Sequence, residues 1–290
     1  MSPTILALVL AAAALHAGWN LISKRVAAGG SAVAFVLAYR ALSLVLYAPW
    51  VAWVLWQGDM AWSPKVLLFI GLASLLHLGY NLSLQLGYQK TDLSVLYPVA
   101  RGTGPLLSSL VAILFLGEAG DPVRLAGIAL VVAGILLIAS DGRLRRFTTP
   151  HARGALWRGL LTGLFIAAYT LVDAWSVKML LIVPVVLDWC AALGNVALLA
   201  PRFVARPQAL QQAMRGRWWP AFWVAALSPL AYILVLYAYR LGGDISLVAP
   251  LREISLMMGT VAGVFILREP ASWGRWLGCA IIIGGGALLA

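Results

Sequence analysis

Asp92-Leu-Ser-Val-Leu-Tyr-Pro98 and Asp244-Ile-Ser-Leu-Val-Ala-Pro250 are two copies of one pattern, placed 152 residues apart. The match continues outward on both sides of this segment. With one residue removed, the offset becomes 151 and pairs Arg101 with Arg252, Glu118 with Glu269, Gly127 with Gly278, and Gly134 with Gly285. Upstream, Ala17-Gly-Trp-Asn-Leu21 aligns with Ala167-Ala-Tyr-Thr-Leu171, and Leu78-Gly-Tyr80 aligns with Leu230-Ala-Tyr232. An ordered series of this kind predicts two repeats of one structural unit.

The composition around this repeat is that of a membrane protein. Hydrophobic residues make up 62% of the 290 residues, charged residues make up 11%, and the mean hydropathy is +0.92. A soluble globule carries about 25% charged residues, so the chain lacks the polar surface that water requires. The net charge of +11 is concentrated in short connections, where it sets membrane orientation and does not indicate a nucleic-acid partner.

Apolar runs long enough to cross a bilayer of about 30 Å recur ten times. The expected spans are Pro3–Ser23, Val33–Trp56, Val66–Tyr88, Leu93–Gly117, Val123–Ser140, Ala155–Val177, Leu180–Pro201, Trp219–Leu241, Ile245–Leu267 and Trp273–Leu289. Five spans per repeat is an odd number, so the second repeat must enter the membrane in the opposite orientation. We therefore predict an all-α integral membrane protein with ten transmembrane helices, arranged as two five-helix inverted repeats. Residues 1–141 form the first repeat, residues 142–153 a basic linker, and residues 154–290 the second repeat.

Lysine and arginine residues predict the orientation of this bundle. The connections on the side of the basic linker carry 14 of them, whereas the other side carries only Lys65, Arg124, Lys178 and Arg240. The count places the linker in the cytoplasm and both termini outside, in a multi-pass protein of the cell (inner) membrane. The first span lacks a basic n-region and a cleavage site, so it is expected to be a helix of the protein and not a signal peptide.

Charged side chains inside a span mark solute pathways, because each costs at least about 2.5 to 3.5 kcal/mol to insert. The repeat predicts that Arg101 and Arg252 approach one cavity from opposite sides, just beyond Pro98 and Pro250; the alternative is that both snorkel to the nearer interface. Glu253 is not expected to form a simple local pair with Arg252, since neighbours on a helix project about 100° apart. Asp173 and Asp188 lie nearer the ends of their spans, where an interfacial role and a functional role are both open. Arg40 can either snorkel to the interface or line the pathway.

Polar and aromatic residues follow the same spans at helical spacing. His16 and His77 lie near span centres, where either one can relay a proton or be a buried neutral histidine hydrogen-bonded to a backbone carbonyl. His77, Tyr80, Asn81 and Gln85 share one face of the third span and should line a cavity or join helices by hydrogen bonds. The other expected solute contacts are Trp19, Asn20, Tyr97, Tyr169 and Tyr232, and the expected hinges are Pro98, Pro105 and Pro250.

Metal, cofactor and catalytic signatures do not emerge from the sequence. Cys190 and Cys279 both lie in apolar runs, and no set of ligands has metal-binding spacing, so neither a metal site nor a cofactor is expected. No nucleophile and base occur at useful spacing, so an enzyme is not expected. Gly259-Thr-Val-Ala-Gly263 and Gly274-Arg-Trp-Leu-Gly278 indicate close helix packing, within a monomer or in a homodimer.

Leu15-His-Ala-Gly-Trp-Asn20, Tyr97-Pro-Val-Ala-Arg-Gly102, Leu116-Gly-Glu118, Pro250-Leu-Arg-Glu253 and Leu267-Arg-Glu-Pro270 give the chain a recognisable family character. The chain resembles the EamA-type drug/metabolite transporter superfamily, as a ten-helix member with two EamA repeats. The resemblance implies an alternating-access carrier with spans 1, 3, 4, 6, 8 and 9 around the cavity and spans 5 and 10 toward the edge. It also implies termini in the cytoplasm, contrary to the charge count.

The leading hypothesis is a secondary active transporter, expected to export a small polar metabolite. Arg101 and Arg252 would attract a carboxylate, and Glu253 or a histidine would compensate an amine, so an amino acid or a similar amphoteric solute fits best. The alternatives are a flippase or carrier for a lipid-linked or anionic metabolite, and a cation or drug exporter. The last of these lacks the acidic residue in the first span that small multidrug relatives use. Expected partners are the solute, membrane lipids and a coupling proton or ion, and no nucleic acid.

Overall fold

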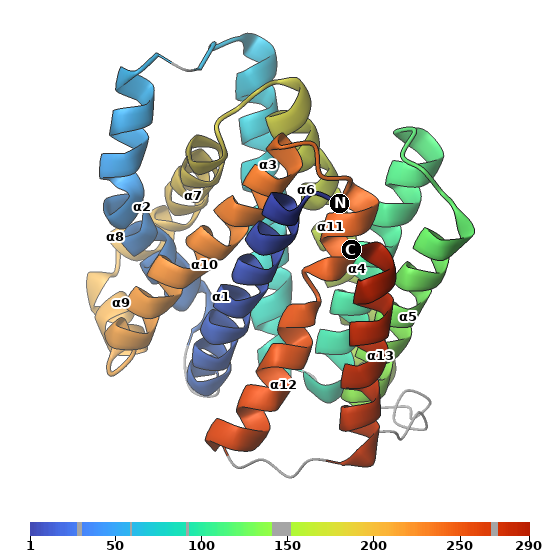
Figure 1. The fold of residues 1–290 in the computed structure, drawn as a ribbon. Helices are drawn as coiled ribbons and strands as arrows, with labels where there is room; N and C mark the ends of the chain where they lie inside the picture. The colour runs from blue at the N-terminus through green and yellow to red at the C-terminus, as the bar shows by residue number, and fades with distance from the viewer. Residues whose placement is uncertain (28–30, 59, 91–92, 141–151, 268–271) are drawn as a thin grey trace.

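The computed structural model describes residues 1–27, 31–58, 60–90, 93–140, 152–267 and 272–290, and within them it is built from α-helices (Figure 1). Most of the basic linker, together with Asp92 and Glu269, lies outside these ranges. The helices are α1 (Pro3–Ala27), α2 (Ala32–Trp56), α3 (Pro64–Lys90), α4 (Leu93–Phe115), α5 (Pro122–Ser140), α6 (Ala152–Met179), α7 (Pro184–Leu199), α8 (Pro201–Val204), α9 (Pro207–Met214), α10 (Trp218–Arg240), α11 (Ile245–Leu251), α12 (Ile254–Leu267) and α13 (Trp273–Leu289).

Ten membrane spans are present in the described part of the chain, as the hydropathy predicts. Eight segments are long and apolar enough to cross a bilayer, and α7 and α13 are shorter apolar helices. α8 and α9 are short helices in the connection between α7 and α10, which the sequence did not predict. Large apolar side chains such as Leu67, Leu114 and Phe265 are exposed on the outside of the bundle. Apolar residues on the outer surface are what lipid contact requires, so the prediction of an all-α integral membrane protein is confirmed.

The ninth span is broken in its middle. α11 ends at Leu251, Arg252 and Glu253 lie in turns, and α12 begins at Ile254. The break follows Pro250, whose ring cannot continue the helical hydrogen-bond ladder. A hinge is expected at Pro250. The expectation that Arg252 and Glu253 diverge as neighbours on a regular helix is wrong, because at this interruption Nε of Arg252 lies 3.6 Å from Oε1 of Glu253.

The fourth span, by contrast, is one continuous helix. α4 runs from Leu93 to Phe115 through both Pro98 and Pro105. The expectation of helix breaks at these two prolines is therefore wrong for this conformation. Each proline removes one backbone donor, and the packing of α4 against α5, α6 and α11 holds the helix together around that loss.

A contact between two helices recurs between the repeat equivalents of those helices, as two inverted repeats predict. α1 packs on α10, and its repeat equivalent α6 packs on α3. In the same way α4 packs on α6 while α12 packs on α1, and α3 packs on α7 while α10 packs on α2. Two further pairs, α2 with α7 and α5 with α13, join a helix to its own equivalent. The repeat boundaries themselves stay a prediction.

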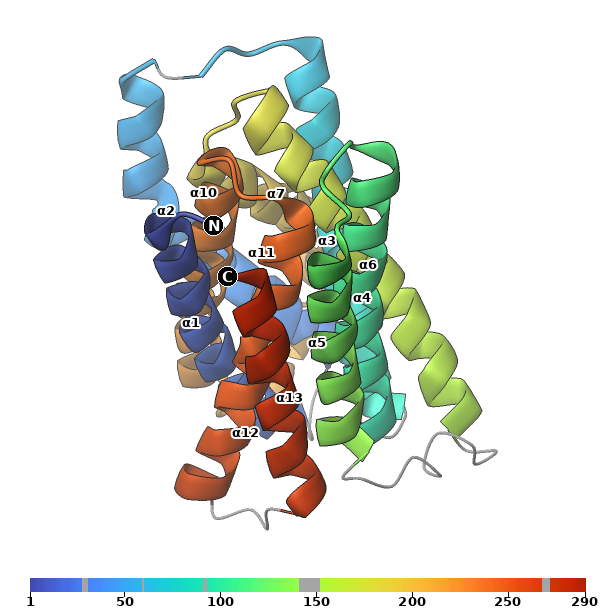
Figure 2. The same cartoon turned by 45° about the vertical axis from the view of Figure 1, so that its right-hand side comes forward.

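Glycines bring α5 and α13 together at one edge of the bundle (Figure 2). A Cβ atom on Gly285 would lie 2.8 Å from the carbonyl oxygen of Gly127, and one on Gly134 would lie 2.8 Å from that of Gly278. The repeat alignment exchanges these two contacts, because it pairs Gly127 with Gly278 and Gly134 with Gly285. Gly278 of the predicted glycine motif therefore serves packing within the fold.

Candidate functional site

Six side chains of arginine, aspartate and glutamate from the membrane spans are buried in the centre of the bundle. Their exposed fractions are 5% or less, for Arg40, Arg101, Asp173, Asp188, Arg252 and Glu253. The three arginines therefore do not snorkel to an interface. Three positive and three negative groups give this core a net charge of zero. They lie in three separate groups of side chains, described below as the first, second and third place, and each has its own local charge.

The first place is an arginine–glutamate cluster, formed by Arg101, Arg252 and Glu253. The Nε atom of Arg101 lies 2.9 Å from Oε2 of Glu253, and the Nε atom of Arg252 lies 3.6 Å from Oε1. The broken ninth span allows this arrangement, because it turns Arg252 and Glu253 to the same side while α4 supplies Arg101. The structure thus brings the two repeat-related arginines to a single carboxylate, which leaves the cluster with a formal charge of about +1.

The cluster has unused hydrogen-bonding capacity. Nη2 of Arg101 donates to the Ser255 hydroxyl at 3.0 Å. Within the described residues, the Nε and Nη1 atoms of Arg101 and the Nε and Nη2 atoms of Arg252 make no hydrogen bond, and both oxygens of Glu253 accept none. The ions are close enough to attract but are not aligned. Buried polar atoms without partners are costly, so a group of this size calls for a ligand or water that completes it.

Tyr97 lies one helical turn before Arg101 on α4, and its ring centre is 5.7 Å from the guanidinium carbon. This is the distance of a cation–π contact. Spacing of four residues along a continuous helix places both side chains on one face, so the unbroken α4 is what positions them together.

The second place is a histidine–aspartate cluster, formed by His77 on α3, Asp173 and Tyr169 on α6, and Tyr232 on α10. The Nε2 atom of His77 lies 2.7 Å from Oδ2 of Asp173, and the Tyr232 hydroxyl donates to the same oxygen at 2.6 Å. The ring of Tyr169 stacks on the His77 ring with centroids 4.4 Å apart. Tyr80 contacts Tyr169 edge to face at 5.3 Å. The cluster therefore surrounds one carboxylate with a histidine and three tyrosine rings.

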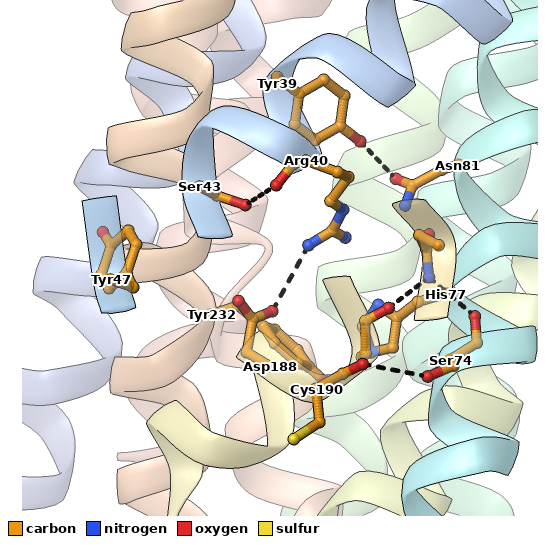
Figure 3. Close-up of polar contacts among 12 residues, drawn as sticks. Tyr39, Arg40, Ser43, Tyr47, Ser74, His77, Asn81, Asp188, Cys190 and Tyr232 are labelled. Carbon is orange, nitrogen blue, oxygen red and sulfur yellow. Dashed lines mark hydrogen bonds and ion pairs between the residues drawn. The ribbon is translucent and has the colours of Figure 1, made fainter. Parts of the chain in front are cut away.

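The third place is the ion pair between Arg40 on α2 and Asp188 on α7, with Nη1 and Oδ1 3.7 Å apart. Figure 3 shows this pair facing across the helices near His77. The neighbouring Tyr39 hydroxyl donates to Oδ1 of Asn81 on α3 at 3.0 Å. Asn81 follows His77 by one turn, so the polar stripe of α3 contacts both the second and the third place. These bonds join helices, which is one of the two roles expected for the stripe.

His16, Trp19 and Asn20 form a local group on α1. The Trp19 indole donates to Nδ1 of His16 at 3.2 Å, and the Asn20 amide donates to the His16 carbonyl at 2.8 Å. Accepting at Nδ1 assigns the ring proton of a neutral His16 to Nε2. His16 lies within electrostatic range of Arg101 and Arg252. Both bonds join His16 to residues of its own helix.

Asp173 and Asp188 were expected near span ends, and the structure places both in the core. α6 extends to Met179, beyond the predicted end, and α3 and α10 cover its last turns. The spacing of Tyr169 and Asp173 is a signal that could have identified this face, since residues i and i+4 lie one above the other. Nothing in the sequence indicated that Arg40 pairs with Asp188, because the two residues are 148 positions apart.

A further polar group holds the start of α11 at one end of the bundle. The Glu118 carboxylate accepts from the backbone N–H groups of Ile245 and Ser246 at 2.7 and 2.8 Å. Arg124 on α5 donates to Asp244 and to the Ser246 hydroxyl, each at 2.9 Å. Charge-assisted bonds from Glu118 and Arg124 therefore fix the N-terminus of α11, the start of the broken span, to the first half of the chain.

Asp121 caps the start of α5 beside this group. Its Oδ1 atom accepts from the backbone N–H groups of Val123 and Arg124, each at 3.0 Å. The N–H of Arg124, followed by that of Val123, lowers the pKa of the Asp121 carboxyl. The capping bond stabilises the ionised form, which is the physical cause of this shift.

Ten apolar spans around a buried charged core define the chain as a multi-pass α-helical membrane protein. Residues 3–140, nearly half of the chain, match the EamA-like transporter family, which confirms the resemblance found in the sequence. A protein of known crystal structure superimposes with a TM-score of 0.73 over 99% of this chain and 96% of that chain, at 19% identity, which shows the fold alone.

Two relatives are named as uncharacterized transporters. The uncharacterized transporter YwfM of Bacillus subtilis (strain 168) is 31% identical over 149 residues, which are 48% of this chain and 46% of that protein. An uncharacterized transporter in the cobO 3'region of Sinorhizobium sp is 36% identical over 75 residues, which are 26% of this chain and 53% of that protein. The matches thus span about half the length of each relative.

Proposed function

We propose that the protein is a secondary active transporter of the cell (inner) membrane that moves a small amphoteric metabolite, with amino acids as the leading class. The family match and the names of the relatives support transport in general. The substrate class rests on the arginine–glutamate cluster. Export is the expected direction, and alternating access between the two repeats is the expected mechanism.

The observation that carries the proposal is the complementary set of unfilled groups in this cluster. Arg101 and Arg252 present donors without partners, and Glu253 presents acceptors without partners, among the described residues. An amino-acid head group carries a carboxylate and an ammonium group on neighbouring atoms. Its carboxylate can accept from the two guanidinium groups while its ammonium donates to Glu253, so one ligand satisfies both halves of the set.

The local charge agrees with this substrate class. A lipophilic cation would enter a cluster with a formal charge of about +1, where repulsion opposes binding. A simple anion would satisfy the arginines but leave Glu253 without a donor. An amphoteric solute meets both requirements, and the aromatic ring of Tyr97 beside Arg101 gives its side chain an apolar contact.

The buried position of the cluster supports alternating access. Arg101 comes from the first half of the chain and Glu253 from the second, so a relative movement of the halves changes the contacts on both sides of a bound solute. The basic side of the bundle, which includes Arg202, Arg206, Arg215 and Arg217 around α8 and α9, would face the cytoplasm.

A thermal-shift screen of the purified protein tests the proposal. Amino acids, aminophosphonates, organic acids and lipophilic cations are added singly, and each ligand-induced change in melting temperature is measured. A ligand at 100 times its Kd stabilises the folded state by about 2.7 kcal/mol. We expect amphoteric ligands to raise the melting temperature.

Variants of the two arginines make the test specific. Arg101→Gln and Arg252→Gln should abolish the ligand-induced change, and Arg101→Lys should weaken it, because lysine keeps the charge but loses the planar fork. Arg124→Gln, which lies outside the core, is the matched control and should respond like the unaltered protein. A cation that stabilises all variants equally would contradict the proposed substrate class.

A further inference from the structure

We propose that the histidine–aspartate cluster of His77, Asp173 and Tyr232 is a proton-binding site that couples transport to the proton gradient. This inference rests on the proposed transport function, and it assigns the coupling ion and the residues that carry it. The ligand is the proton itself, and the site is separate from the arginine–glutamate cluster.

The geometry suits the exchange of a single proton. His77 and Tyr232 both contact the same oxygen of Asp173, at 2.7 and 2.6 Å, and the side chains of His77 and Asp173 are 6% and 1% exposed. With His77 neutral, its Nε2–H donates to the carboxylate and the cluster carries one negative charge. A proton that binds at Nδ1 converts the pair to imidazolium and carboxylate, and the charge of the cluster becomes zero. No other group has to gain or lose a proton in this step.

The second oxygen of Asp173 is the independent observation that identifies a binding site. Oδ1 is buried and accepts no hydrogen bond from the part of the chain that the structure describes. A purely structural aspartate would be expected to use both oxygens, since an unsatisfied buried acceptor is costly. A free acceptor beside a paired histidine leaves the cluster able to hold an added proton in more than one place.

The repeat alignment shows that the titratable pair of this cluster, His77 and Asp173, has no titratable counterpart in the other repeat. Tyr232 has Tyr80 as its equivalent, and Tyr169 has Trp19. At the same offsets His77 corresponds to Pro229, and Asp173 corresponds to Ser23. The aromatic surroundings are therefore duplicated, while the titratable pair occurs once. Groups that the fold needs twice are repeated, so a pair that occurs once points to a task that the transport cycle needs once.

The cluster is placed to influence the solute site. His77 belongs to the first half of the chain and Asp173 to the second, so the contact between them crosses between the halves. Tyr169, which stacks on His77, lies within electrostatic range of Arg101, Arg252 and Glu253. A change of one charge in this core alters the potential at the arginine–glutamate cluster, because a low dielectric screens it weakly.

The charged and titratable groups around His77 are known element by element. α3 packs on α1, α2, α4, α6 and α7. Besides Asp173 and Tyr232, the titratable and charged groups on these helices that face the core include His16, Tyr39, Arg40, Tyr97, Arg101, Tyr169 and Asp188. Only His77 and His16 among them have an unperturbed charge change between about pH 5 and 8. His16 accepts a bond at Nδ1 from Trp19, whereas Nε2 of His77 faces a carboxylate.

A direct titration tests the proton site without transport. The chain has three histidines, His16, His77 and His151, so the ¹⁵N NMR signals of histidine-labelled protein in lipid nanodiscs can be assigned with His77→Gln. We expect the His77 ring signals to change reversibly between about pH 5 and 8, and Asp173→Asn to move the midpoint. Asp121→Asn, which removes an exposed carboxylate at the start of α5, is the control and should leave it in place. A His77 ring that keeps one form over the whole range would overturn the proposal.

Transport in liposomes then tests coupling, with a radiolabelled amino-acid mixture as the probe. A pH difference of about one unit supports at most about tenfold accumulation with one proton per solute. The unaltered protein should accumulate the probe under this gradient and also exchange it without a gradient. Asp173→Asn should keep exchange and lose accumulation. Exchange without any response to the gradient in the unaltered protein would overturn the proton site and leave the proposed function intact. Absence of exchange would instead count against the proposed function, and the NMR titration would still decide on the proton site.

Discussion

The contact between α5 and α13 gives the sharpest test of the fold, through two adjacent glycines. A Cβ on Gly285 would lie 2.8 Å from the carbonyl oxygen of Gly127 and 2.9 Å from the amide nitrogen of Val131, whereas a Cβ on Gly284 would meet nothing within 4 Å. Both neighbours of Gly285 are backbone atoms, so the clash is relieved only if the helices separate. Gly285→Ala should therefore destabilise the protein, and Gly284→Ala should not.

The size of the effect follows from two terms. Overpacking of this kind costs about 1 to 3 kcal/mol, while alanine is favoured over glycine in a helix by about 1 kcal/mol. The helix term is common to both variants and cancels in their difference, which should be about 1 to 3 kcal/mol. At about 2 to 4 °C per kcal/mol, Gly285→Ala should melt about 2 to 12 °C below Gly284→Ala.

Thermal unfolding in detergent at one scan rate, followed by the fluorescence of the 13 tryptophans, measures this difference. Gly134→Ala provides a second reading, because Gly134 is the repeat equivalent of Gly285 and its Cβ would lie 2.8 Å from the Gly278 carbonyl oxygen. It should show a loss of similar size. Equal melting temperatures for Gly285→Ala and Gly284→Ala would refute the close approach, and with it the two-fold relation of the halves at this edge.

Three further predictions concern polar groups. Glu118→Ala should lower stability by about 0.5 to 2 kcal/mol, measured by the same unfolding assay, because it leaves the N–H groups of Ile245 and Ser246 without their acceptor; an unchanged stability would show that water replaces the carboxylate. Arg40→Met should be strongly destabilising, by about 3 to 5 kcal/mol, since it leaves Asp188 unpaired, whereas Arg40→Met with Asp188→Leu should recover most of that loss; a double variant as unstable as the single one would contradict the pairing. The folded pKa of Asp121 is lowered, so its stabilising effect is present above the unfolded value of about 3.9 and is lost as the pH falls through the folded value; melting temperatures measured from about pH 5 down to 3 should fall less for Asp121→Asn, and equal slopes would count against the cap.

The fold could be predicted almost completely from the sequence because hydropathy and repetition are both local signals. Ten apolar runs gave the spans, and the repeated segment ending at Pro98 and Pro250 gave the relation of the halves. The helix interruptions could not be predicted as well. The repeated segment ends at Pro98 in the first half and at Pro250 in the second. The helix continues through Pro98 in α4 but is interrupted after Pro250, between α11 and α12. Whether a proline interrupts a helix depends on what surrounds the lost hydrogen bond and not on the proline alone.

The candidate site was predicted in part, and the difference has a physical cause. Arg101, Arg252 and Glu253 were selected because charge in a span is costly wherever it lies. The partners of Arg40 and His77 were not found, because Asp188 and Asp173 appeared close to span ends when each helix was considered alone. Their depth depends on the lengths and packing of neighbouring helices, which are tertiary properties.

The distribution of the buried charges explains how two similar halves became dependent on each other. The first half contributes Arg40 and Arg101 to the core, and the second contributes Arg252 with Asp173, Asp188 and Glu253. Each half taken alone therefore carries two uncompensated buried charges, of opposite sign, whereas the whole core is neutral. Repeat alignment shows where this arose, because Arg101 and Arg252 correspond to each other but Glu253 corresponds to Gly102. Burial of two unpaired charges is prohibitive in a membrane, so the halves have to assemble around a shared core. A movement that separates them during transport must replace the lost partners with solute, water or a proton. The polar contacts that cross between the halves in the core are where such replacement has to occur: Arg101 with Glu253, His77 with Asp173, and Arg40 with Asp188.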